Sequence, residues 1–181
     1  YAYFIEKGMT RSYWLVDGEE FTTSFHRIYS SMSLTDNLLN GESYYIAEIK
    51  AIKRIVDSAK KEGPSILCFV DEVLRGTNTI ERISAASEIL REFSLSPVMC
   101  FAATHDIELT HILEACYENY HFEEQVKENQ VTFDYRLKKG RAMSRNAIRL
   151  LGMMGYPEEL ITQAEETAKH FIQTGEWRIL L

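Results

Sequence analysis

The sequence is poor in cysteine and has no long hydrophobic run. Its three cysteines are odd in number and form no Cys-x-x-Cys pair, which argues against a disulfide framework and indicates a reducing, cytoplasmic location. Cys68 and Cys100 lie in apolar runs and are expected to be buried thiols. The longest apolar stretches, residues 66–70 and 98–103, are far shorter than the roughly 20 residues of a membrane span, so we expect no membrane association.

Positive charge is also in the minority. The 20 Lys and Arg residues stand against 27 Asp and Glu residues, which leaves a net charge of -7. Because this is the wrong sign for neutralising a phosphate backbone, direct DNA binding by this segment is disfavoured. Hydrophobic residues make up 45% of the 181 positions, enough for the buried core of about one domain, and this excludes intrinsic disorder.

Hydrophobic periodicity predicts strands and helices in alternation through the first half of the chain. Alternating residues over 21–28 predict a short strand, and helical spacing predicts a helix over 45–59. The continuous apolar runs at 65–72 and 98–103 are typical of strands buried on both faces, and a helix is predicted between them over 80–93. This order favours an α/β fold with a right-handed parallel strand-helix-strand unit.

The second half of the chain is predicted to be more irregular. Asp106 is placed to cap a short helix over 107–113. Alternation across residues 120–137 predicts an antiparallel hairpin at an edge of the sheet. Two amphipathic helices, over 144–154 and 157–171, are predicted to close the chain.

An acidic pair, Asp71-Glu72, directly follows the first buried strand. A Walker B element has this pattern: its Asp holds Mg²⁺ through water, and the neighbouring carboxylate orients the attacking water. Strands also end in acidic residues that simply face solvent, so the spacing alone leaves both interpretations open.

The second buried strand ends in Thr104-His105. Because parallel strands share a carboxyl edge, where open α/β folds bind ligands, we expect these residues to lie near the acidic pair. The imidazole could hydrogen-bond a terminal phosphate or hold the nucleophilic water. The alternative is an imidazole that caps the helix starting at Asp106.

Two polar loops complete the set of candidate motifs. Residues 75–79, with Gly76 among them, follow the acidic pair, and Thr79 is a candidate N-cap of the next helix. The loop SLTDNLLNGES leads Gly41 and Ser43 to the start of a helix, whose free N–H groups favour anions. Many solvent-facing caps have the same composition.

In combination these motifs resemble the ATPase domain of the MutS family of DNA mismatch repair proteins. The resemblance rests on ILCFVDEVLRGTNT at 66–79 and ATHD at 103–106. SLTDNLLNGESYY is similar to the signature loop of that family, and the two terminal helices are similar to its dimerising helix-turn-helix. The motifs occur in the order of the family and cover about residues 20–171.

The resemblance implies an ABC-type, P-loop NTPase-like parallel sheet flanked by helices, with ATP and Mg²⁺ as its ligands. If the matching residues have the roles they have in the family, Asp71 assists Mg²⁺ binding, Glu72 orients or activates water, and His105 senses the γ-phosphate. Thr104 then counts among the nucleotide-binding residues. All four residues come from the two matching strand ends.

The resemblance also implies a homodimer, formed through the nucleotide interface and the terminal helices. Gly41 and Ser43 would reach the nucleotide of the partner subunit. We expect residues 1–140 to form a partial ATPase domain and residues 141–181 a helical dimerisation segment. DNA would be bound by upstream domains that this chain does not contain.

The sequence departs from the family at two points. No Gly-Lys-Ser or Gly-Lys-Thr of a P-loop occurs in it, and the chain opens at Tyr1 as a fragment beginning after that loop would. Without the N–H cradle and its Lys we expect the fragment to bind ATP poorly and not to hydrolyse it. Leu74 stands where many members carry Gly.

These observations favour the C-terminal part of a MutS-like protein that binds mismatched or otherwise structured DNA and switches its DNA clamp with ATP. One alternative is a non-catalytic dimerisation module in which Asp71 and Glu72 are relics. Another is a different ABC-type ATPase of DNA repair or chromosome organisation. Those relatives carry a glycine-rich LSGGQ-like signature, which the loop at 33–43 matches less well.

Overall fold

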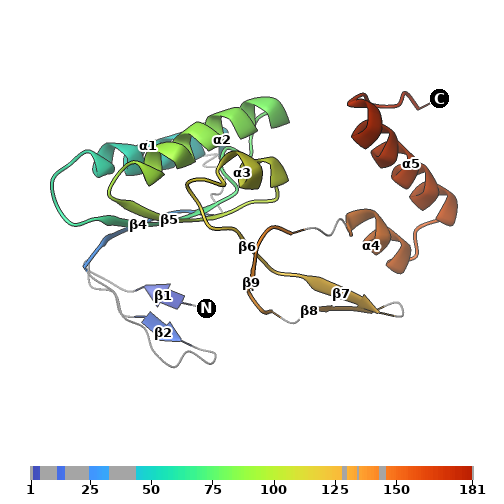
Figure 1. Ribbon diagram of the computed structural model, residues 1–181, viewed down its shortest axis with the longest axis horizontal. Helices are drawn as coiled ribbons and strands as arrows, with labels where there is room; N and C mark the ends of the chain where they lie inside the picture. Colours follow the sequence, from blue (N-terminus) through green and yellow to red (C-terminus); the bar gives the residue numbers. More distant parts are fainter. Residues whose placement is uncertain are drawn as a thin grey trace. The chain divides into compact units, whose positions relative to one another are not determined.

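The chain divides into two compact units, Tyr1–Glu118 and Asn119–Leu181 (Figure 1). The computed structural model describes residues 2–4, 12–14, 25–32, 44–127, 130–133, 135–142 and 146–180. In the first unit, β1 (Ala2–Phe4) pairs antiparallel with β2 (Ser12–Trp14). The parallel sheet of the same unit carries the candidate site.

That sheet has three strands in the order β3 (Arg27–Ser31), β4 (Ile66–Asp71) and β5 (Val98–Ala103). Both pairs are parallel, and Asp71 stands opposite Ala103 at the carboxyl edge. The two predicted strands and their parallel connection are therefore confirmed.

The strand predicted over residues 21–28 is wrong in its position. It overlaps β3 only at residues 27 and 28; Phe25 and His26 lie outside any strand, and residues 21–24 lie outside the described part. The physical reason is register, because β3 begins where Arg27 pairs with Ile66 and donates its N–H to the Ser65 carbonyl at 3.0 Å.

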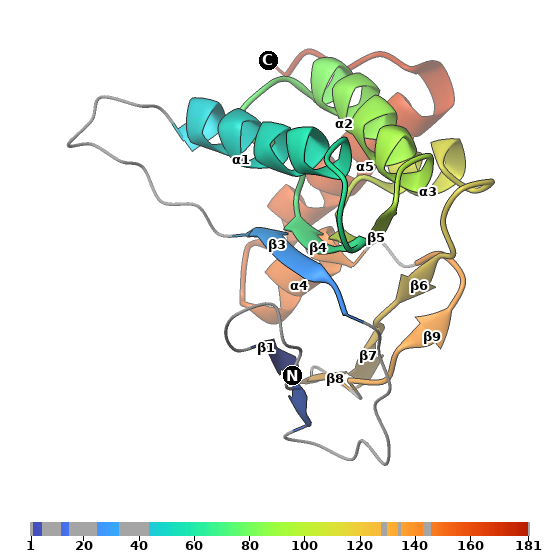
Figure 2. The same ribbon diagram turned by 90° about the vertical axis from the view of Figure 1, so that its left-hand side faces the viewer.

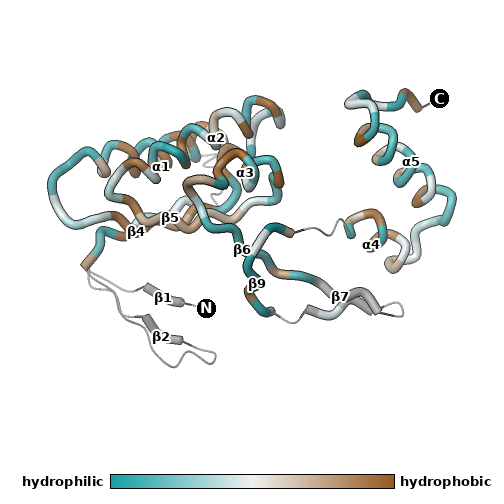
Figure 3. Tube along the Cα trace, viewed as in Figure 1, coloured by the Kyte–Doolittle hydropathy of each residue, from teal (hydrophilic) through white to brown (hydrophobic). Residues whose placement is uncertain are grey.

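Three helices cover one face of the sheet: α1 (Tyr44–Ala59), α2 (Thr79–Ser94) and α3 (Ile107–Ile112) (Figures 1 and 2). Hydrophobic and hydrophilic segments alternate along α1 and α2, as expected of helices with one buried face (Figure 3). All three were predicted.

Asn78, and not Thr79, caps α2. Its side-chain oxygen accepts the Glu81 N–H at 3.0 Å, and the Glu81 carboxylate in turn accepts from the Asn78 side-chain amide at 2.6 Å and from the Thr77 hydroxyl at 2.9 Å. This arrangement satisfies one free donor of the first turn and places a negative charge there, both of which stabilise a helix start.

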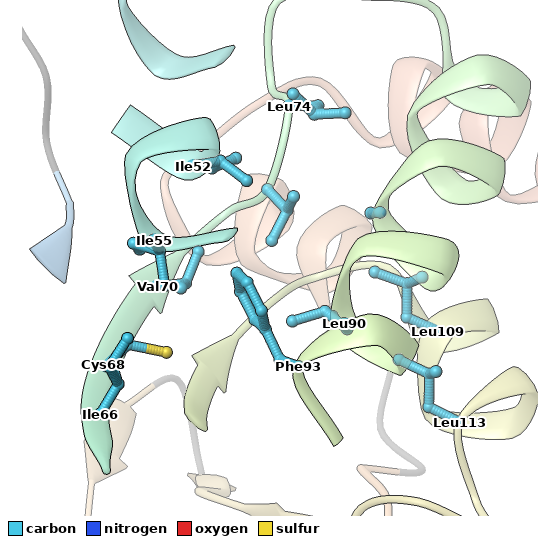
Figure 4. Packing of buried hydrophobic residues seen from close by; sticks show 12 residues of the cluster. Ile52, Ile55, Ile66, Cys68, Val70, Leu74, Leu90, Phe93, Leu109 and Leu113 are labelled. Carbon is cyan, nitrogen blue, oxygen red and sulfur yellow. The ribbon is translucent and has the colours of Figure 1, made fainter. Parts of the chain in front are cut away.

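The core lies between the sheet and these helices (Figure 4). In Figure 4, Phe93 points from α2 toward the side chains of β4. The fully or nearly fully buried members are Ile52, Ile55, Ile66, Cys68, Val70, Val73, Leu74, Ala86, Leu90, Phe93, Leu109 and Leu113. Burial of this apolar surface supplies the main stabilisation of the unit and holds the ends of β4 and β5 in place.

Burial on both faces was predicted for β4 and β5, and for β5 it is wrong. Met99 and Phe101 are 55% and 58% exposed, whereas Val98 and Cys100 on the other face are partly buried. Phe101 stacks on Phe69 with 5.5 Å between ring centroids. The described helices of this unit cover one face only, so the second face of β5 keeps its apolar side chains accessible.

All three cysteines are free thiols, as expected. Cys68 is buried, Cys100 is only half-buried, and Cys116 is exposed. Cys68 and Cys100 face each other across β4 and β5. The hydrogen bond with Cys100 and the burial of the thiol raise the pKa of Cys68 far above its ordinary value, so Cys68 stays protonated and unreactive.

The second unit contains two antiparallel ribbons. β6 (Tyr120–His121) pairs with β9 (Lys138–Lys139), and β7 (Glu124–Lys127) pairs with β8 (Gln130–Phe133). The predicted hairpin is confirmed, but its placement at an edge of the parallel sheet is wrong. Among the described strands, β7 and β8 hydrogen-bond only to each other.

A cluster of charged side chains, His121, Glu123 and Lys138, stabilises the β6–β9 ribbon. The two ring nitrogens of His121 lie 2.9 Å from the Gly140 carbonyl and 3.0 Å from the Glu123 carboxylate, which also accepts from Lys138 at 2.7 Å. Both ring nitrogens thus face acceptors. The Gly140 carbonyl, followed by Glu123, raises the pKa of His121, which favours the doubly protonated ring that donates to both.

The predicted helix pair is confirmed as α4 (Ala147–Met153) and α5 (Glu158–Thr174). Gly155 lies between them with φ +83°, and Gly175 ends α5 with φ +75° and donates its N–H to the Phe171 carbonyl at 2.8 Å. Neither helix contains a buried residue. In the described residues, no helix combines the length and the apolar character that crossing a bilayer requires.

Candidate functional site

The ends of β4 and β5 lie side by side. Asp71 is paired with Ala103, and the Glu72 N–H continues the ladder by donating to the Ala103 carbonyl at 2.9 Å. The residues that follow each strand, Asp71-Glu72 and Thr104-His105, therefore share one edge of the sheet. Four predicted site residues are brought together, and the other two, Gly41 and Ser43, lie outside the described residues.

Glu72 is turned toward the end of β5. Its backbone is left-handed, with φ +56°, a conformation that costs a non-glycine residue about 1–2 kcal/mol. The Glu72 side chain is 13% exposed; its Oε1 accepts the His105 backbone N–H at 2.9 Å and lies 3.8 Å from the His105 Nε2. Oε2 lies 4.0 Å from the Arg75 Nε. The second carboxylate of the acidic pair thus points across the strand ends.

The His105 side chain is accessible to a ligand. It is 97% exposed, although its backbone is tied to Glu72. Thr104 beside it accepts the Asp106 N–H on its hydroxyl at 3.0 Å, which shapes the turn after β5. Asp71 is half-buried at the end of β4. One accessible imidazole and two carboxylates therefore surround the point where the strands end.

Asp106 has a different task from the one predicted. It occupies the N-cap position of α3 but makes no side-chain capping hydrogen bond. Its carboxylate instead accepts two hydrogen bonds from Arg82 of α2, at 2.8 and 2.6 Å, with both side chains at most 20% exposed. The pair with Asp106 raises the pKa of the Arg82 guanidinium. This bidentate ion pair anchors the turn that carries His105 to α2.

Glu48, a residue that the sequence analysis did not identify, holds the loop after the acidic pair. This α1 residue is 2% exposed, and its two oxygens accept the backbone N–H groups of Leu74 at 2.6 Å and Arg75 at 3.1 Å. Burial raises the pKa of the Glu48 carboxyl, and the two N–H donors and the Arg75 charge offset part of that rise. One signal was present, because Glu48 precedes Ile52 and Ile55 by four and seven residues on the apolar face of α1.

Leu74 has the backbone conformation of a glycine although it is not one. Its φ is +59°, and its side chain is 4% exposed and belongs to the core. The leucine at this position therefore does not prevent a left-handed loop.

Gly76 shows that the same loop packs closely against α1. A Cβ at Gly76 would lie 2.8 Å from the Tyr45 Cβ, closer than real Cβ atoms approach. Since Tyr45 and Glu48 lie about one helical turn apart, α1 contacts the loop at two neighbouring points.

The chemistry of these groups fits a hydrated Mg²⁺ bound together with phosphate. Carboxylate oxygens are the ligands that Mg²⁺ prefers, and Mg²⁺ retains several waters and takes oxygens from substrate phosphates. Among the described residues, no group of three or more His, Cys, Asp or Glu side chains is arranged to hold a metal alone. Asp71 and Glu72 are two carboxylates at this edge that could contribute ligands to such a cation.

Comparison with known proteins identifies the family of the chain. The model of the family "MutS domain V" matches residues 16–172. Over 147 residues the chain is 34% identical to the DNA mismatch repair protein MutS of Pseudothermotoga lettingae, covering 78% of this chain and 18% of that protein. Over 145 residues it is 30% identical to the MutS of Aquifex pyrophilus, covering 78% and 17%. The chain thus spans less than a fifth of the length of these curated relatives, and it belongs to the MutS domain V family.

Proposed function

We propose that this chain is the C-terminal part of the ATPase of a MutS-like protein, which binds ATP at a dimer interface and uses it to switch a DNA clamp. The observation that carries the proposal is the meeting of Asp71, Glu72 and His105 at one edge of the sheet. The MutS domain V match supports this family over another ABC-type repair or chromosome-organising ATPase.

In this proposal each strand-end residue has one task. Asp71 binds the hydrated Mg²⁺, Glu72 orients and activates the attacking water, and His105 senses the γ-phosphate with Thr104 beside it. Mg²⁺, when bound, neutralises the charge that develops on the transferred phosphoryl group. Glu72 is suited to its task because the His105 N–H fixes one carboxylate oxygen. Gly41 and Ser43 would act on the nucleotide of the partner subunit.

DNA recognition is assigned to other parts of the parent protein. The net charge of -7 makes this chain a poor partner for a phosphate backbone. The relatives are named DNA mismatch repair proteins, and the chain matches only 17–18% of their length. The proposed parent binds mismatched or otherwise structured DNA through its remaining domains.

The proposal is tested by ATP turnover in a protein that joins this chain to a P-loop segment. We expect Mg²⁺-dependent hydrolysis that stops when EDTA removes the metal, because the phosphates and Asp71 share the ion. The chain alone, which contains no Gly-Lys-Ser or Gly-Lys-Thr, should show no turnover. If the joined protein hydrolysed ATP no faster than the uncatalysed background at saturating Mg²⁺ and ATP, this result would contradict the proposal and favour the non-catalytic dimerisation module.

The helix pair gives a specific reason to expect self-association. No residue of α4 or α5 is buried, and Leu160 on the apolar stripe of α5 is 44% exposed. Leu160→Glu is expected to weaken self-association at least tenfold, because it places a charge on the surface that would be buried in a dimer. Thr162→Glu, which introduces the same charge at an exposed position on the opposite face of the helix, is the matched control. Sedimentation equilibrium measures both, and a strict monomer, or equal behaviour of the two variants, would rule out this interface.

A further inference from the structure

We propose that Glu48 is a positioning residue for ATP hydrolysis, through which α1 sets the conformation of the loop at residues 72–75. This inference rests on the proposed function, because it assigns Glu48 an effect on the chemistry of Asp71 and Glu72. Glu48 itself does not touch the nucleotide. The residue is 2% exposed, and each oxygen of its carboxylate already accepts a backbone N–H.

The contact has the form of an anion bound by consecutive backbone amides. Leu74 and Arg75 present neighbouring N–H groups, and the left-handed conformation at Leu74 turns these groups toward the same point. Such a concave arrangement of amides binds anions in many phosphate sites. Here the anion is the carboxylate of Glu48, a residue of α1.

The loop needs this stabilising contact because two of its residues have left-handed backbone conformations. Glu72 and Leu74, with φ +56° and +59°, both adopt a conformation that residues with a Cβ avoid. The two hydrogen bonds to Glu48 oppose relaxation of Leu74 to ordinary dihedral angles. Gly76, packed on Tyr45, holds the other end of the loop against the same helix.

Relaxation of Leu74 would reach the proposed catalytic group directly. Glu72 is two residues away, and in the present left-handed backbone conformation its carboxylate accepts the His105 N–H. A small rotation between residues 72 and 74 would move the carboxylate away from the attacking water. Glu48 therefore affects the chemical step more than nucleotide binding.

The first experiment replaces Glu48 with Gln in the ATPase that joins this chain to its P-loop segment. The amide keeps the shape of the side chain but can accept only one of the two N–H groups. We expect kcat per nucleotide-binding site to fall by about 10- to 100-fold, while KM for ATP stays within about twofold. Glu92→Gln, at an exposed position of α2, is the matched control and should behave as the wild type. Unchanged kcat in Glu48→Gln would overturn the inference.

A double-mutant cycle with Leu74→Gly separates positioning from general destabilisation. Glycine adopts φ near +59° without strain, so the conformation of the loop should depend less on its hydrogen bonds to Glu48. In the Leu74→Gly background, Glu48→Gln should lower kcat by less than about threefold. An undiminished effect would contradict a role through the conformation of Leu74.

If Leu74→Gly does not fold, amide hydrogen exchange gives the same answer on the single variant. Exchange of the Leu74 and Arg75 amides should be at least tenfold faster in Glu48→Gln than in Glu92→Gln. Equal exchange rates of these amides in the two variants would contradict the stabilisation of the loop by Glu48.

Glu72→Gln and the wild-type joined protein separate failure of this inference from failure of the proposed function. If Glu72→Gln turns over ATP as fast as the wild type, the role proposed for Glu72 fails. If the wild-type joined protein itself shows no turnover above background, the proposed function fails. If Glu72→Gln is inactive and Glu48→Gln is normal, only the role of Glu48 fails.

Discussion

Replacing Glu72 with Gln should lower ATP turnover by about 10²- to 10⁴-fold in the protein that joins this chain to a P-loop segment, with little change in ATP affinity. Gln keeps the size of the side chain and one oxygen for the His105 N–H, which Glu72 accepts at 2.9 Å. It removes the charge and the basicity with which Glu72 is proposed to activate water. The loss therefore falls on the chemical step, and Asp71 remains available for Mg²⁺.

Single-turnover hydrolysis and equilibrium binding of ATP, measured on the same samples, separate the two effects. Glu92→Gln, which changes an exposed carboxylate of α2, is the control and should leave both quantities unchanged. Hydrolysis at the wild-type rate in Glu72→Gln would remove Glu72 from the mechanism. A joint loss of affinity and turnover would instead indicate a structural role.

Asp106→Asn should lower the free energy of unfolding of the chain by about 2 kcal/mol. The substitution is nearly isosteric, and Asp106 makes no side-chain capping bond that it could lose. It leaves the Arg82 guanidinium, only 20% exposed, without its charge partner. The expected loss lies below the about 3–5 kcal/mol of a fully buried pair because water still reaches part of the arginine.

The matched control is Asp57→Asn, the same change in an exposed pair. Asp57 accepts from Lys53 one turn earlier on α1 at 2.7 and 2.9 Å, and both side chains are about half exposed or more. Solvent screening makes such pairs weak, so this variant should unfold at nearly the wild-type urea concentration. Equal midpoints for both variants would show that the Arg82–Asp106 pair does not stabilise the turn after β5.

Much of the site could be predicted because local side-chain patterns encode it. A continuous apolar run followed by Asp71-Glu72 predicts a buried strand with carboxylates at its end, and β4 confirms the strand. Helical spacing predicts α1 and α2 nearly to their ends. Since parallel strands share a carboxyl edge, the approach of His105 to Glu72 also followed from the sequence.

Other features depend on partners that are distant in the sequence. The bounds of β3 are set by its pairing with β4, from Arg27 opposite Ile66 onward, so an alternating pattern at residues 21–28 mispredicted them. The placement of the hairpin was wrong for the same reason, because alternation indicates two strands but not the sheet they join.

The amino-acid pattern alone thus settled which strands carry the acidic pair and the imidazole, because apolar runs and their polar ends are local properties. Only the folded chain revealed that Glu48 binds the Leu74 and Arg75 amides and that Leu74 is left-handed. It also revealed that Asp106 pairs with Arg82. A buried charge selects its partners by distance in space, and here they lie about 25 residues away along the chain, beyond any helical or strand period.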